Sequence, residues 1–158
     1  MALPSQPLIA PLAPSKSKKE FFERLNLSEH NEEHEDLYNA MKLEAANGRD
    51  RINRNPESLA SQDRDSGEIQ MPYEARWITE TAKHREILRI YNTASSRTRA
   101  WYDKGRYMTG GNEENWIVRW LLWHVFRYSD NRRRLSPEPS NDAPRSGLPY
   151  DPARPEGR

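Results

Sequence analysis

The last predicted helix of this chain carries hydrophobic residues on both of its sides. It covers about residues 113–128 and contains the run NWIVRWLLWHVFRY at 115–128. An α-helix turns by about 100° per residue. On that wheel one half is aliphatic and holds Ile117, Val118, Leu121, Leu122, Val125 and Phe126. The other half holds three tryptophans and two arginines. Because a helix in a small monomer needs only one buried face, the second half has no obvious partner.

A longer amphipathic helix is predicted upstream, over about residues 72–104. Pro72 suits the first turn of a helix. The apolar residues share a stripe about 140° wide. They are Trp77, His84, Ile87, Leu88, Tyr91, Ala94, Trp101 and Tyr102. Ser95-Ser96 is a point where this helix could kink or end. We expect the stripe to pack on the aliphatic half of the final helix, within a helical core at residues 72–131.

Residues 16–47 form an acidic helical segment in this prediction, and Asn47-Gly48 is expected to end it. From residue 20 to residue 47 there are 8 acidic and 2 basic residues, whereas residues 76–107 hold 8 basic and 3 acidic ones. The two predicted helices therefore have opposite charges and can neutralise each other. Residues 48–71 contain turn-forming residues without periodicity, which indicates a polar linker.

Both ends of the chain are rich in proline. Residues 1–15 contain four prolines, which favour an extended arm over a helix. Residues 132–158 begin with three arginines and continue with six prolines. We expect extended arms at both ends of the domain, lying over neighbouring molecules.

Composition narrows the fold class to mainly α. Only 34% of the 158 residues are hydrophobic, and Leu, Ile, Val and Phe make up about 16%. A value below ~20% combined with a high net charge indicates disorder, but here the net charge is only +1, which favours an ordered core with long polar arms. Two valines are too few to supply a sheet. The prediction is a small irregular helical domain, with two principal helices, an acidic N-terminal helix and proline-rich arms.

Several classes of protein are disfavoured by what the sequence lacks. The absence of cysteine excludes disulfides, thiolate metal sites and cysteine nucleophiles. No apolar run approaches the ~18 residues of a membrane span, and the N-terminus does not resemble a signal peptide. We expect an intracellular protein of the cytosol, nucleus or an organelle matrix, not a secreted one. No side chains are spaced as a nucleophile or an acid–base pair, so no catalytic residue, metal, cofactor or small-molecule substrate is inferred.

Tryptophan combined with arginine is typical of protein interfaces, because both bury a large area at modest entropic cost. The candidate partner-binding residues, which we call the tryptophan face, are Trp116, Arg119, Trp120, Trp123 and Arg127. Two interpretations stay open. The face docks on another protein subunit, or it is core that the acidic segment of the same chain covers.

Basic residues interleaved with aromatic rings suggest a second hypothesis, contact with the phosphates of RNA or DNA. The candidate phosphate contacts are Arg85, Arg89, Arg132, Arg133 and Arg134. Neutralisation of these charges by the acidic segment is the simpler interpretation. Ser136 follows the three arginines and precedes Pro137, which makes it a candidate phosphorylation site.

Together these observations predict a non-catalytic accessory or structural subunit of a larger assembly, with other protein subunits as partners. A nucleic-acid-binding or ribonucleoprotein subunit is the alternative. A peripheral membrane-surface protein that uses the tryptophan face as an interfacial helix is a third hypothesis.

Overall fold

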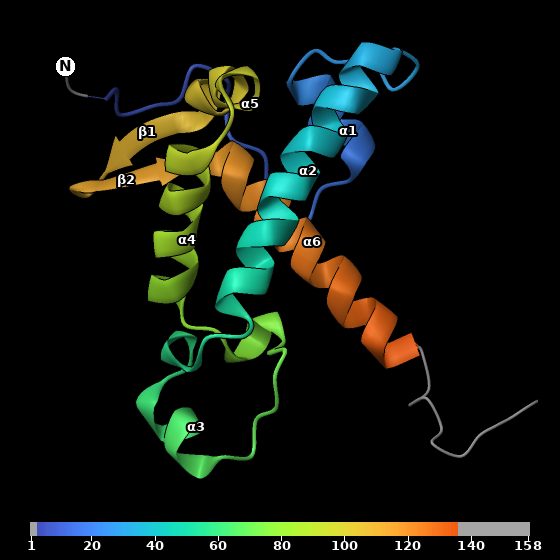
Figure 1. The fold of residues 1–158 in the computed structure, drawn as a ribbon. Helices are drawn as coiled ribbons and strands as arrows, with labels where there is room; N and C mark the ends of the chain where they lie inside the picture. The colour runs from blue at the N-terminus through green and yellow to red at the C-terminus, as the bar shows by residue number, and fades with distance from the viewer. Residues whose placement is uncertain (1–2, 136–158) are drawn as a thin grey trace, which may run out of the picture. The chain divides into compact units, whose positions relative to one another are not determined.

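The computed structural model describes the backbone of residues 3–135 and the side chains of residues 3–132. Within that range the chain is mainly helical, as the composition predicts, and residues 3–127 belong to one compact unit (Figure 1). The α-helices are α1 (Lys18–Arg24), α2 (Glu32–Ile52), α3 (Ser61–Ser66), α4 (Glu80–Thr93), α5 (Ser96–Tyr102) and α6 (Trp116–Leu135). Strands β1 (Arg106–Thr109) and β2 (Asn112–Asn115) form a hairpin. Three short 3-10 helices are η1 (Pro56–Ser58), η2 (Ala75–Trp77) and η3 (Asp103–Gly105).

Polar side chains fix the starts of the helices. Ser17 and Glu20 form a capping box at α1, in which each side chain accepts from the other residue's backbone N–H. The Asn31 side chain accepts from the backbone of the first turn of α2, and Thr79 does the same for α4. Such caps satisfy N–H groups that the helix itself leaves without a partner.

The predicted helix at residues 72–104 is in fact two helices, α4 and α5, and Pro72 lies before both. The break falls at Ser95, whose side chain caps α5 by accepting from the backbone N–H of Thr98. The carboxylate of Glu44 on α2 also accepts from the Ser95 backbone N–H at 3.1 Å and from the Thr98 hydroxyl at 3.0 Å. A cap supplied by another helix therefore overrides the continuous apolar stripe.

The acidic helix does not end at Asn47-Gly48, because α2 continues to Ile52. Gly48 is buried where α2 packs along α4, and a Cβ at this position would lie 2.6 Å from Ile90 Cδ1. This glycine allows close approach of two helices instead of ending one. The predicted linker at 48–71 accordingly holds the last turn of α2, η1 and α3.

A β-hairpin precedes the final helix, although the sequence argued against a sheet. Its strands pair antiparallel in the register Thr109↔Asn112, and the turn is made by Gly110 and Gly111 at φ 55° and 83°. A two-residue turn with positive φ at both positions suits glycine and matches the twist of a hairpin. The final helix therefore begins at Trp116 instead of residue 113, and it runs to Leu135 instead of 128.

The aliphatic half of α6 lies in the core, as predicted. Ile117, Val118, Leu121, Leu122, Val125 and Phe126 are all buried. They share this core with Tyr102 of α5 and with apolar residues of α1, α2 and α4. α2 packs along α4 and crosses α6, and the hairpin lies beside α4 and α5 (Figure 1).

The expected neutralisation between acidic and basic helices takes a different form. The ion pair that joins α2 to α4 has its arginine, Arg51, on α2 and its carboxylate, Glu86, on α4. Glu86 is only 4% exposed, so the pair compensates a buried charge. No helix within the described residues is long and apolar enough to cross a membrane.

Candidate functional site

Two of the three tryptophans in the tryptophan face lie inside the chain's own core. Trp120 has no exposed surface and Trp116 is 4% exposed. The Trp120 ring stacks on Phe21 of α1, with ring centroids 3.9 Å apart and planes 14° apart. Trp116 meets the same phenyl ring edge-on at 6.1 Å. The covered-core interpretation therefore describes these two positions, since residues of the same chain cover both rings.

The proline-rich N-terminal arm closes over this part of α6. Trp116 Nε1 donates to the Ile9 carbonyl at 2.7 Å, and Trp120 Nε1 donates to the Lys16 carbonyl at 3.2 Å. His124 Nε2 lies 2.8 Å from the Pro14 carbonyl. These donors stand at four-residue intervals, which places them along one stripe of the helix. We call Trp116, Trp120 and His124 the donor row.

Arg24 at the end of α1 also binds the arm. Its guanidinium donates to the carbonyls of Ala10 at 2.8 Å and Pro11 at 2.7 Å. Side chains of the folded unit therefore bind five backbone carbonyls of residues 9–16. Two backbone bonds add to them, from the Ile9 N–H to the Lys104 carbonyl and from the Met108 N–H to the Pro4 carbonyl. The arm is held through its main chain more than through its side chains.

His124 donates a hydrogen bond through Nε2 in this arrangement. Because a carbonyl oxygen only accepts hydrogen bonds, the proton sits on Nε2, which faces Pro14. Burial, with a smaller contribution from the nearby Arg127, lowers the pKa of His124, while the carbonyls of Pro14 and Lys16 oppose that shift. The ring also stacks on Trp120 at 3.7 Å.

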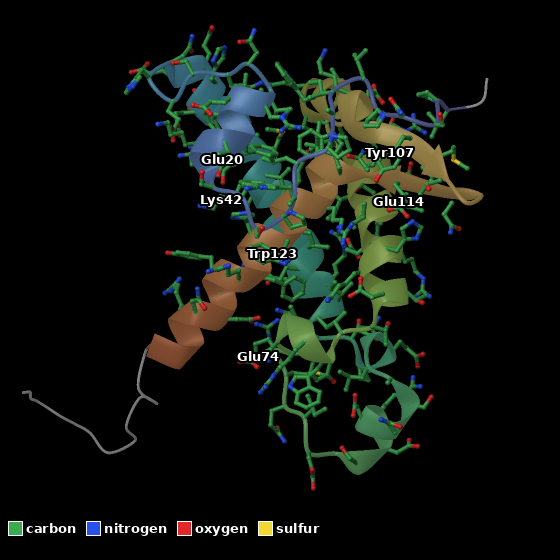
Figure 2. The ribbon with its side chains drawn as sticks, turned by 180° about the vertical axis from the view of Figure 1, so that it is seen from behind. Glu20, Lys42, Glu74, Tyr107, Glu114 and Trp123 are labelled. Atoms are coloured by element: carbon green, nitrogen blue, oxygen red, sulfur yellow. The ribbon has the colours of Figure 1, made fainter. Side chains whose placement is uncertain are left out.

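The remaining members of the tryptophan face form a neighbouring stripe, which we call the exposed strip: Arg119, Trp123 and Arg127. Both arginines are exposed and Trp123, labelled in Figure 2, is partly exposed. The Arg127 guanidinium lies 5.2 Å from the centroid of the Trp123 ring, within cation–π range. The structure thus divides the predicted face into a covered row and an open strip.

The predicted phosphate contacts fall in different parts of the chain. Arg85 and Arg89 lie on the exposed side of α4. Arg132 stacks over Tyr128 at 5.6 Å, within the last turns of α6. The side chains of Arg133 and Arg134, and the candidate phosphorylation site Ser136, lie outside the described residues.

Sequence reasoning missed the roles of Arg24, Phe21 and His124. The arm's prolines were a usable signal, since an extended proline-rich chain leaves its carbonyls open to donors. Regular spacing of Trp116, Trp120 and His124 was a second signal. The sequence gives no indication that these donors lie within hydrogen-bonding distance of the arm.

No group of three metal-binding side chains occurs among the described residues. The most buried polar cluster, where Tyr102 donates to Glu44 at 2.7 Å, joins α5 to α2. Burial, and then the bond to Glu44, raises the pKa of Tyr102. This cluster serves the fold, and the tryptophan face remains the candidate site.

The chain matches no protein-family model, and the comparisons found no similar curated protein and no similar solved structure.

Proposed function

We propose that this protein is a non-catalytic accessory subunit of a larger assembly, and that it binds another protein through the exposed strip. The observation that carries the proposal is an indole that stays partly exposed between two exposed arginines on one helix stripe. Trp and Arg are the residues most enriched among those that dominate binding energy at interfaces. A guanidinium stacked on a ring keeps its N–H groups directed outward, where they can bind a carboxylate.

The charge of the strip indicates the chemistry of the partner. Within residues 3–132, neither Arg119 nor Arg127 forms an ion pair, whereas Arg51 and Arg106 do. Two cations about two helical turns apart, neither ion-paired within the described residues, attract an acidic surface and repel a basic one. The expected partner surface therefore has carboxylates on either side of an apolar patch that covers Trp123.

The test compares variants of the full chain as bait in affinity purification from its native cells, with and without nuclease. Trp123→Ala should weaken binding by about 2 kcal/mol, or roughly thirtyfold in Kd. Reversing both charges in the strip, Arg119→Glu with Arg127→Glu, should abolish capture. The matched control is Arg85→Glu with Arg89→Glu, which changes the net charge equally on α4.

A partner lost only in the strip variants, and insensitive to nuclease, supports the proposal. If the strip variants retain every partner, the exposed strip is not a docking site. Association with liposomes lost in Trp123→Ala would instead favour the membrane-surface hypothesis.

Nucleic-acid binding is kept as a second candidate because Arg85 and Arg89 are exposed one turn apart on α4. Among the described residues neither of them forms an ion pair, so both are available for phosphate. This candidate predicts binding that falls steeply with salt and is lost in the Arg85→Glu, Arg89→Glu control.

A further inference from the structure

We infer that the donor row and Arg24 form a binding site for an extended, proline-containing peptide, in which the chain's own N-terminal arm sits as an intramolecular competitor. The partner is a proline-rich segment of another protein. This site is separate from the exposed strip, and the inference does not depend on the proposed function.

The chemistry of the contacts defines the ligand class. Four side chains, Trp116, Trp120, His124 and Arg24, donate to backbone carbonyls of the arm. Proline has no N–H, and the arm forms neither a helix nor a strand, so most of its carbonyls are free to accept. Its internal turn bond, from the Lys16 N–H, uses the Ala13 carbonyl, which none of the four donors binds. Known proline-rich peptide sites work in this way, with aromatic side chains lining a groove.

The arm contributes few contacts that belong to its own sequence. Leu12 is its one buried side chain among the described residues, at 8% exposure, and the partly buried Ile9 packs against the same core. Leu8 is 78% exposed, although it is a large apolar residue. A site that holds main-chain carbonyls and one leucine accepts other peptides with a leucine close to prolines.

Of the described arm residues, Leu12 belongs to the buried core and Ile9 packs against it, so release of the arm removes a small part of that core. The arm's described residues form neither a helix nor a strand, whereas Phe21, five residues beyond Lys16, starts the buried part of α1. An attached competitor raises the apparent Kd of a free peptide by the inverse of the fraction of molecules with an open site. Release of the arm should therefore expose the site to a peptide from outside.

The test uses the full chain and a fluorescent peptide with the sequence of residues 3–16, followed by anisotropy. Leu12→Asp in the protein should release the arm, because a carboxylate replaces the buried leucine. We expect this variant to bind the peptide at least about tenfold more tightly than the native chain does. A peptide that itself carries Leu12→Asp is the matched control and should not bind.

The donor row is tested in the released variant. Adding Trp116→Phe keeps an aromatic ring and removes the N–H that binds the Ile9 carbonyl. Peptide binding should weaken about five- to tenfold, the effect of one lost hydrogen bond. A groove that recognises only apolar surface would bind the peptide unchanged.

Two further measurements cover the case in which Leu12→Asp does not fold. Leu12→Ala is a milder substitution that should still release the arm, and this variant should also bind the peptide more tightly than the native chain does. In the native chain, the Ile9 amide should exchange with deuterium at least about a hundredfold faster than the buried Val118 amide. If a folded variant binds no more tightly than the native chain, or if the two amides exchange at equal rates, the inference is wrong.

Discussion

Truncation of Trp120 tests whether the tryptophan face is core or interface. Trp120 is fully buried, stacks between Phe21 and His124, and donates to the Lys16 carbonyl. Removal of so large a buried side chain typically costs about 3–5 kcal/mol, since transfer energy is lost and a cavity remains. For a chain of this length we expect Trp120→Ala to lower Tm by roughly 6–20 °C.

The assay is urea unfolding followed by far-UV circular dichroism, which does not depend on tryptophan fluorescence. Trp123→Ala is the matched control, since the same truncation at a partly exposed position should cost less than about 1.5 kcal/mol. If Trp120→Ala costs under about 1 kcal/mol while it abolishes partner binding, the packing of α1 on α6 described above is wrong.

Three other predictions concern residues that pack at the start of α6 and the histidine that contacts the arm. Asn115 accepts from the Val118 N–H at 3.2 Å and is buried, so Asn115→Ala should lower the free energy of unfolding by about 1–2 kcal/mol in the same urea assay. A Cβ on Gly105 would lie 2.7 Å from Ile117 Cγ1, so Gly105→Ala should cost about 1–3 kcal/mol, and a second change, Ile117→Val, should recover part of it. The lowered pKa of His124 means that the unfolded chain binds a proton more readily, so stability should decrease as pH falls below about 6.5. Thermal melts across this range should show that Tm depends less on pH in His124→Gln than in the native chain. An equal dependence of Tm on pH in both proteins would mean that other groups cause the effect.

The aliphatic half of α6 illustrates what periodicity can predict. Its six apolar residues recur at helical spacing, so they fall on one face of a helix and can be buried together, and all six are buried. The mainly helical class was predictable for a similar reason, since the chain has too few β-branched residues for a large sheet. A pair of glycines at positive φ still allows a short hairpin beside the helices.

The errors in helix boundaries have tertiary causes. The break before α5 falls at Ser95-Ser96, which the sequence marks as a possible kink or end, and Ser95 caps α5 locally. What the sequence does not show is the added bond to Glu44, which lies 51 residues before Ser95. Continuation of α2 through Gly48 depends on Ile90, which occupies the space that a side chain would take. Neither partner can be found from local propensity, because each contact exists only after the helices have packed.

The candidate site was found only in part for the same reason. Its residues on α6 were identified by composition, but their division into two stripes depends on where Phe21 and the arm lie. The arm itself was expected to bind neighbouring molecules. In the structure its carbonyls meet donors of the same chain, which turns a predicted docking face into a row of buried contacts beside a smaller exposed strip.

Exchange of the indole N–H groups tests this division most directly. In a nitrogen-15 spectrum after transfer to deuterated water, the indole signals of Trp116 and Trp120 should persist, since both groups donate to arm carbonyls and both rings are buried. The indole signal of Trp123, on the exposed strip, should disappear first of these three. Loss of all three signals at the same rate would contradict the account, because it would show that the arm does not cover the tryptophan face.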